Sequence, residues 1–389
     1  MITNAGKSIL SKYLIGQSPS YASHIAIGCG PNAIDSAGEF GDYSEYESLD
    51  FEMFRVPILS RGYITDATGT SIALSAELPT EDRYEITEVG IFSSGTNPSA
   101  GSRDSKNLFT ITEAEGWEYH DQNGPKTIPF RTKRLNDNDD YPLDINFTIE
   151  LPSEPDPVMP TVFFANASNT IFENEARANR NERCRFLDSM IMIRGDEGDI
   201  SIDEDTGNLI ENAGSNHIHR TGITIPLERN SQEDKMKLAL SVINREEAAG
   251  DPDEVRILME FRSTESDAET AQFSTFSARI TDFSDGRYFV VSKDLGDLTP
   301  TSTDFTWSSI SVVKITACVI KAGVKSDKWY VAIDGVRLEN VSTKNPLYGM
   351  TGYSVVRTED GLPIVKESNT KSIVEFRFAI DVDGPIGVS

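Results

Sequence analysis

The stretch MKLALSVINREEAAGDPDEVRILMEFRS, residues 236–263, decides the fold class of this chain. In each half, every second residue is apolar. These residues are Met236, Leu238, Leu240 and Val242 in the first half, and Val255, Ile257, Met259 and Phe261 in the second. Period two is the pattern of a β-strand with one buried face. Polar residues that include Gly250-Asp251-Pro252 separate the halves. The stretch therefore predicts a hairpin of two antiparallel strands.

The alternation continues toward the C-terminus. It recurs in FSARITDF (276–283), RYFVVSK (287–293), SISVVKITACVI (309–320), KWYVAIDGVRLEN (328–340) and IVEFRFAIDV (373–382). Short strands separated by turn residues predict an antiparallel β-sandwich. Within the fourth of these segments, Asp334 and Gly335 suit a type I′ turn, so we expect a hairpin there.

The N-terminal part has mixed patterns. Residues 4–15 have one apolar face at helical spacing, with Asn4 as the cap and Gly16 as the end. Strand-like segments follow, beginning with HIAIG (24–28). The segment PSEPDPVMP (152–160) holds four prolines and predicts a stiff linker. We therefore expect a mainly β chain with an N-terminal helix: a small α+β module over 1–151, the linker, and a jelly-roll sandwich over 161–389.

The charge balance limits the partners. The chain has 389 residues and a formal net charge of −26. Binding to nucleic acid needs clustered cations, so we expect no nucleic-acid partner. We also expect no membrane insertion, because no apolar run reaches the length of a membrane helix, and no export, because Lys7 and Lys12 interrupt the apolar residues at the N-terminus. Docking to another protein would rely on local apolar patches or a basic partner surface.

The segment SHIAIGCGPNA (23–33) fits the glycine-rich turn that holds a dinucleotide. However, no helical pattern follows Gly30, and the next residues are rich in Asp and Glu. Without a helix N-terminus no aligned dipole holds a phosphate, so we reject this interpretation and expect the glycines to permit a sharp turn.

Four short motifs occur in order in the first hundred residues. They are Thr3-Asn4-Ala5-Gly6; Ile25-Ala26-Ile27-Gly28 with Gly30; Leu49, Glu52 and Arg55; and Ile86 with Glu88-Val89-Gly90-Ile91-Phe92. This order resembles the N-terminal module of bacteriophage tail fibre and tail-collar proteins. The resemblance implies a virion structural protein, assembled in the host cytoplasm, that docks onto a tail, baseplate or neck ring. Homo-oligomers are the natural expectation for such rings. We expect no enzyme and no cofactor.

Three of the motif residues are charged although they lie in apolar strands. Buried charges persist when paired, so Glu52 or Glu88 could bind Arg55 and pin two strands together. The alternative is that each faces water. Gly90 marks either a bulge or a close approach of another chain segment.

The second domain resembles concanavalin-like (laminin G-like) sandwiches in WYVAIDGVRLEN (329–340), NPLYGMTGYSVV (345–356) and the strand from residue 373. Some members of that class bind sugars, so Trp329, Tyr330, Tyr348 and Tyr353 are candidates for a glycan-facing surface, with core or rim positions as the alternative. Host-glycan binding and capsid decoration are therefore alternative functions.

The remaining candidate motifs give weaker evidence for a functional site. His217 and His219 share one strand face and could hold a metal, but no third ligand is identifiable, so we predict no metal. Asp203, Asp205 and Gly207 lack the full pattern of a calcium loop and favour a hairpin tip, and the acidic run 136–140 is interpreted likewise.

Cys29, Cys184 and Cys318 form no CxxC pair or disulfide framework. No nucleophile motif is present, so a polysaccharide-cleaving enzyme is only an alternative.

Overall fold

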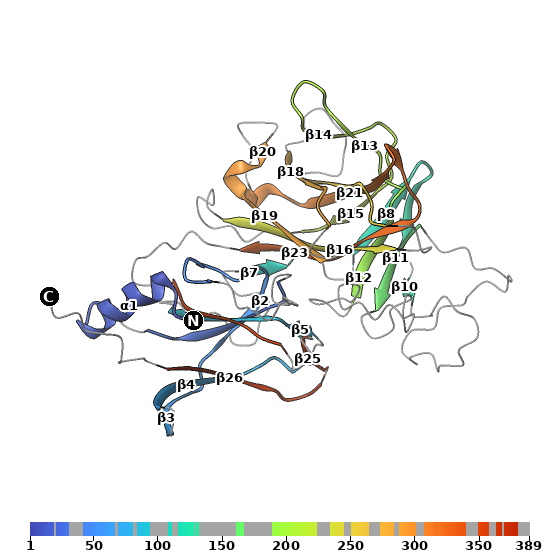
Figure 1. The fold of residues 1–389 in the computed structure, drawn as a ribbon. Coiled ribbons are helices and arrows are strands. Elements are labelled where there is room, and N and C mark those ends of the chain that lie inside the picture. Colours follow the sequence, from blue (N-terminus) through green and yellow to red (C-terminus); the bar gives the residue numbers. More distant parts are fainter. Residues whose placement is uncertain are drawn as a thin grey trace, which may run out of the picture. The chain divides into compact units, whose positions relative to one another are not determined.

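The computed structural model describes residues 1–18, 21–30, 42–66, 69–80, 84–93, 108–110, 116–128, 130–131, 161–166, 189–223, 234–244, 250–263, 273–283, 288–300, 307–339, 349–357, 363–367 and 369–379. Within these residues the chain is mainly β, and α1 is the only α-helix. The predicted fold class is therefore confirmed. The chain forms two compact units, Met1–Leu108 with Thr343–Ser389, and Phe109–Ser342 (Figure 1).

The N-terminal unit combines one helix with antiparallel sheets. Its elements are α1 (Asn4–Leu14), β1 (His24–Gly28), β2 (Glu52–Pro57), β3 (Ser60–Asp66), β4 (Gly69–Glu77), β5 (Tyr84–Ile86), β6 (Glu88–Ser93), β24 (Gly349–Val355), β25 (Ile364–Lys366) and β26 (Ile373–Ala379). The main sheet has the order β2-β1-β6-β24, a second has the order β26-β4-β3, and β25 pairs with β5.

Helix α1 begins at Asn4, as the sequence indicated, but its N-cap lies one residue earlier than expected. Thr3, not Asn4, is the N-cap, because its hydroxyl accepts a hydrogen bond from the Gly6 N–H at 2.9 Å. The same hydroxyl donates to the Met350 carbonyl in β24. Gly16, at φ +74°, follows the helix end as predicted.

The second unit is a sandwich of two sheets. Its strands are β7 (Leu108–Thr110), β8 (Trp117–Asp121), β9 (Gly124–Thr127), β10 (Phe130–Arg131), β11 (Val162–Asn166), β12 (Ser189–Arg194), β13 (Ile200–Ile202), β14 (Leu209–Glu211), β15 (His217–Thr221), β16 (Lys235–Asn244), β17 (Glu254–Arg262), β18 (Phe273–Ile280), β19 (Tyr288–Asp294), β20 (Thr299–Pro300), β21 (Val312–Lys321), β22 (Val324–Lys325) and β23 (Trp329–Glu339). Short 3₁₀ helices lie at Leu295–Asp297 and Trp307–Ser309.

One sheet has the order β10-β11-β12-β23-β16-β19, with β7 on β23. The other has the order β20-β18-β17-β21-β15-β8-β9, with β22 on β21. The alternating apolar residues of β16 and of β17 belong to one shared core cluster. The two rows therefore line the inner faces of opposite sheets, as expected for a sandwich.

The predicted hairpin between β16 and β17 is wrong. β16 pairs with β19 and β23, whereas β17 pairs with β18 and β21 in the other sheet. The Gly250-Asp251-Pro252 segment thus belongs to a connection between the sheets. Strand alternation identifies the buried face of each strand, but it does not identify the neighbour.

The predicted type I′ turn at Asp334 and Gly335 is also wrong. Both residues lie inside the continuous strand β23. Gly335 pairs with Ala239 and Ile333 pairs with Leu240, so Asp334 is an extra residue in a β-bulge. The buried Asp334 carboxylate accepts a hydrogen bond from the Tyr288 hydroxyl at 2.9 Å.

The units divide the chain differently from the predicted boundaries. Residues 152–160, the predicted linker, lie outside the described residues. The sandwich begins before residue 161, since β8 and β9 belong to it, and it ends before residue 389. The last three strands, β24, β25 and β26, pair with β6, β5 and β4 of the N-terminal unit.

Two further findings complete the description. Cys29 and Cys318 are buried free cysteines, and Cys184 lies outside the described residues. Among the helices that the structure describes, none has the length and apolar character needed to cross a membrane.

Candidate functional site

The carboxylate of Glu88, the first residue of β6, binds backbone groups from the segments of two other N-terminal motifs. Its Oε1 accepts hydrogen bonds from the backbone N–H groups of Gly30 at 3.0 Å and Phe51 at 2.8 Å. Its Oε2 accepts from the Asp50 N–H at 2.9 Å and from the Tyr353 hydroxyl at 3.0 Å. Glu88 is fully buried, so these donors replace the water that a carboxylate otherwise needs.

Gly28 and Gly30 leave the space that this carboxylate fills. A Cβ on Gly28 would lie 2.4 Å from Oε1 of Glu88, and a Cβ on Gly30 would lie 2.8 Å from it. An acidic side chain thus occupies the space beside both glycines, and it would repel a pyrophosphate. This agrees with rejecting the dinucleotide interpretation, although residues 31–33 lie outside the described part of the chain.

Arg55 pairs with Glu52 and not with Glu88. Its Nη2 donates to Glu52 Oε2 at 3.0 Å, and its Nε donates to Oε1. Both residues lie on β2, so the ion pair itself does not join two strands. The guanidinium carbon lies 3.8 Å from the centroid of the Phe92 ring on β6, and this cation–π contact does connect the strands.

The other motif glycines are sites of close approach. A Cβ on Gly90 would lie 2.5 Å from Leu49 Cδ1, and the pairing of β1 with β6 is regular there, so the close approach and not the bulge is present. A Cβ on Gly6 would lie 2.1 Å from the Thr351 carbonyl oxygen. Ile27 is fully buried in β1. These residues position backbone and core, and they form no open site.

The aromatic residues predicted to face a glycan are buried. Trp329 and Tyr330 are at most 2% exposed, and both pack in core clusters of the sandwich unit. Tyr353 is 1% exposed in the N-terminal unit, where burial and then the charge of Glu88 raise the pKa of its hydroxyl. Tyr348 lies outside the described residues. The core alternative therefore holds for three of the four.

A different cluster lies on the outer face of the sandwich. His217 and His219 project from β15 on the face opposite the core residue Ile218. In the neighbouring strand β8, His120 pairs with His217 and Glu118 pairs with His219. The third candidate ligand, which the sequence did not identify, is therefore His120. No local signal marks it, because it lies on a strand far from His217 in the sequence.

The three histidines lie close enough for one metal ion. One nitrogen from each lies within 4.8 Å of the others. The His120 and His219 ring centroids are 3.8 Å apart, and those of His120 and His217 are 5.3 Å apart. Glu118 Oε2 lies 3.5 Å from Nε2 of His120 and 3.5 Å from Nε2 of His219. This is a set of three imidazoles and one carboxylate.

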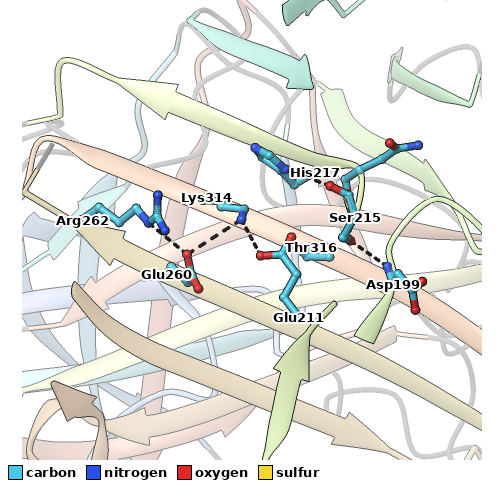
Figure 2. Close-up of polar contacts among 9 residues, drawn as sticks. Asp199, Glu211, Ser215, His217, Glu260, Arg262, Lys314 and Thr316 are labelled. Carbon is cyan, nitrogen blue, oxygen red and sulfur yellow. Dashed lines mark hydrogen bonds and ion pairs between the residues drawn. The ribbon is translucent and has the colours of Figure 1, made fainter. Parts of the chain in front are cut away.

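Hydrogen bonding and burial define the state of His217. Its Nδ1 lies 3.3 Å from the Ser215 carbonyl oxygen (Figure 2). Since a carbonyl only accepts, Nδ1 is the protonated nitrogen. Burial lowers the pKa of His217 to about 3, and the charge of Lys314 acts in the same direction. The imidazole is therefore neutral at pH 7.

Lys314 on β21 pairs across the sheet with His219. Its Nζ donates to Glu211 and lies 4.0 Å from Glu260 Oε2 (Figure 2). Glu211 also accepts from the Thr316 hydroxyl at 2.9 Å. Glu260 also accepts from Arg262 Nε at 3.0 Å, so two carboxylates face two cations beside the histidines.

The loop compared with a calcium site is a hairpin tip, as predicted. It joins the paired strands β13 and β14. The Asp203 carboxylate accepts hydrogen bonds from the N–H groups of Asp205 at 2.8 Å and Thr206 at 3.0 Å, and these bonds lower its pKa. Gly207 has φ +72°, which suits the turn. The acidic run 136–140 lies outside the described residues.

Comparison with known proteins gives a structural similarity. No protein-family profile matches the chain, and no curated protein matches it. Among solved structures, the chain is similar to SGBP-B from a complex xyloglucan utilization locus in Bacteroides uniformis. The identity is 11%, the similarity covers 82% of this chain and 92% of that chain, and the TM-score is 0.28. A TM-score this low carries no argument about function.

Proposed function

We propose that this chain is a structural component of a bacteriophage virion that docks through its N-terminal unit and presents the sandwich. The motif order that resembles tail-collar modules supports this proposal. It acts by assembly, without catalysis, as copies of one chain around a ring. The observation that carries it is the distribution of exposed apolar side chains over the two units.

Nearly all of the large exposed apolar side chains that the structure describes belong to the N-terminal unit. They are Met1, Tyr13, Leu14, Ile15, Leu59, Tyr63, Ile364, Val365 and Ile373, against Ile210 and Val324 in the sandwich. In a chain with a net charge of −26, such residues are where a partner can bind despite the charge repulsion between copies.

The edge strand β3 is the clearest part of this surface. Tyr63 is 77% exposed and Leu59, just before the strand, is 65% exposed. β3 is the last strand of the order β26-β4-β3 within the described residues. An edge strand offers both backbone hydrogen-bonding groups and apolar side chains to a neighbouring protein.

Location on the particle tests the function directly. Antibody against the sandwich would be used for immunogold electron microscopy of intact particles from the source lysate. We expect gold at the tail, baseplate or neck. Gold over the head would instead indicate capsid decoration. No gold on any particle, with purified chain labelled in parallel, would contradict the proposal.

Docking is tested by incorporation. Epitope-tagged chain would be expressed in infected cells, and the amount in purified particles would be measured by immunoblot. We expect the double substitution Leu59→Ser with Tyr63→Ser to reduce incorporation at least tenfold. The matched control, Ile210→Ser with Val324→Ser, removes similar side chains from the sandwich and should incorporate as the wild type does. Equal loss in both variants would contradict docking through the N-terminal unit.

Glycan binding by the sandwich is the alternative proposal. It requires a surface other than Trp329, Tyr330 and Tyr353, because these three aromatic residues are buried. Retention of the full chain on immobilised host polysaccharide, competed by soluble polysaccharide, would favour it. The appearance of new reducing ends in the same incubation would instead indicate a cleaving enzyme.

A further inference from the structure

We propose that His120, His217 and His219 bind one divalent transition-metal ion, Zn²⁺ by preference, with Glu118 as the fourth ligand. The site lies wholly within the sandwich unit, on strands β8 and β15. Neutral imidazole nitrogens with one carboxylate oxygen are a common ligand set for zinc.

The ligand spacing is close to what the metal needs. Tetrahedral Zn²⁺ with bonds of about 2.0–2.1 Å places its ligand atoms roughly 3.3 Å apart. The Glu118 oxygen, at 3.5 Å from both His120 Nε2 and His219 Nε2, nearly satisfies this distance. The three nitrogens lie within 4.8 Å of one another. Closing the largest gap needs a movement of at most about 1.5 Å, which side-chain rotation provides.

Two features of the histidines favour coordination: one hydrogen bond and one buried nitrogen without a hydrogen-bond partner. The hydrogen bond from His217 Nδ1 to the Ser215 carbonyl leaves Nε2 as the nitrogen with a lone pair. Metal-binding histidines usually have their second nitrogen fixed in this way. The His120 Nε2 atom is buried and has no hydrogen-bond partner among the described residues. Metal coordination would satisfy that atom.

The local charge also permits a cation. Lys314 pairs with Glu211 and lies 4.0 Å from Glu260, which also pairs with Arg262, so two carboxylates face these two cations before a metal ion arrives. Glu118 then supplies the negative charge that faces the histidines directly. The chain as a whole is strongly acidic, which raises the local concentration of cations.

Metal binding here would fasten the edge of a sheet. β8 and β9 are the last two strands of their sheet in the described part of the chain. A metal shared by β8 and β15 adds a link between residues far apart in sequence, in the way that a disulfide does. We therefore assign the ion a structural role.

The test uses the full chain without a polyhistidine tag, freed of metal with EDTA and dialysed. Isothermal titration with ZnCl₂ and elemental analysis should give one Zn²⁺ per chain. His120→Ala and His219→Ala should each weaken binding at least 100-fold, and Glu118→Gln should weaken it about tenfold or more. His24→Gln alters the fourth histidine, which lies outside the cluster, and should bind as the wild type does.

A second set of measurements uses the wild type, so that it does not depend on whether the variants fold. Co²⁺ added to the wild type should give the visible absorption of a tetrahedral complex, and Zn²⁺ should abolish it. Zn²⁺, but not Ca²⁺ or Mg²⁺ at the same concentration, should raise the melting temperature of the wild type. Absence of stoichiometric zinc on the wild type, or unchanged affinity in folded His120→Ala and His219→Ala, would overturn the proposal. Neither result depends on where the chain lies on a particle.

Discussion

At the scale of single residues, Glu88 shows how one buried carboxylate organises several chain segments. It accepts hydrogen bonds from the segment after β1, from the segment before β2 and from Tyr353 on β24. Hydrogen bonds to a charged group are stronger than neutral ones, and a donor left unsatisfied in the interior is costly. This residue therefore fixes the geometry that the two neighbouring glycines make possible.

Replacing Glu88 by Gln tests this role. The amide keeps the shape but loses the charge, and its NH₂ group would face backbone donors. We expect a loss of about 3 kcal/mol in unfolding free energy, measured by urea denaturation. Tyr353→Phe removes one of the same hydrogen bonds and should cost about half as much. A cost of Glu88→Gln no larger than that of Tyr353→Phe would contradict the proposed central role.

At the scale of secondary-structure elements, helix α1 is positioned by Gly6. The backbone of Thr351 in β24 lies where a Cβ at this position would be, so no larger residue fits without moving the helix. The N-cap reinforces the contact, since Thr3 also bonds the Met350 carbonyl. Sequence alone favours Ala at such a position, because Ala has the higher helix propensity.

Gly6→Ala should therefore destabilise the protein although it favours the isolated helix. We expect a loss of about 3 kcal/mol in unfolding free energy, at the upper end for an overpacked site. Ser8→Ala changes an exposed position of the same helix and should be neutral or slightly stabilising. Urea denaturation of both variants measures the difference. Stabilisation by Gly6→Ala would show that the helix does not dock on β24 in this way.

The pairing of β17 with β18 depends on a carboxylate. Arg256 and Arg279 lie directly opposite each other, which is unfavourable for like charges. Glu254 accepts hydrogen bonds from both, at 2.6 Å from Arg256 Nε and 2.7 Å from Arg279 Nε. Burial would raise the pKa of Glu254, but the hydrogen bonds from Arg279 and Arg256 outweigh it, and the pKa is lowered.

This lowered pKa has a defined consequence for stability. A depressed folded-state pKa gives stability that is present above the unfolded value, about 4.3 for Glu, and is lost as the pH falls through the folded value. We expect the wild type to be more stable than Glu254→Gln at pH 7, and the difference to shrink between about pH 5 and pH 3. Chemical denaturation across this range measures it. A difference independent of pH would contradict the ion-pair explanation.

At the scale of the whole molecule, the C-terminal segment returns to the N-terminal unit. β24 supplies Tyr353 to Glu88 and Thr351 to Gly6, while β25 and β26 pair with β5 and β4. The sandwich unit is thus an insertion between two parts of the other unit. Folding of the N-terminal unit consequently depends on residues at both ends of the chain.

Removal of residues 343–389 tests this organisation. We expect the N-terminal unit of the shortened chain to be digested rapidly by protease, and the sandwich, residues 109–342, to persist as a resistant fragment. Mass spectrometry of a limited digest identifies the fragments. A chain that lacks only residues 380–389 keeps every described strand and is the control. Loss of the sandwich fragment would instead favour the boundaries predicted from the sequence.

The sequence determined the elements and their buried faces. The alternation at residues 236–263 identified two strands, and both apolar rows do line the core, because side-chain direction along a strand is a local property. The helix and the tip at Asp203 follow from similarly local rules of capping and turn chemistry. The motif order also indicated Glu88 and the two glycines beside it, Gly28 and Gly30.

The tertiary structure decided which strands are neighbours. β16 and β17 entered different sheets, Asp334 became a bulge, and β24 joined β6 although the two strands are far apart in sequence. The same non-local pairing placed His120 beside His217, and it buried three of the four aromatic residues that were candidates for a glycan-facing surface. Every strand offers the same backbone N–H and C=O groups for pairing, so these groups do not determine which strand becomes its neighbour. The neighbour is determined by how the apolar faces of all the strands pack together.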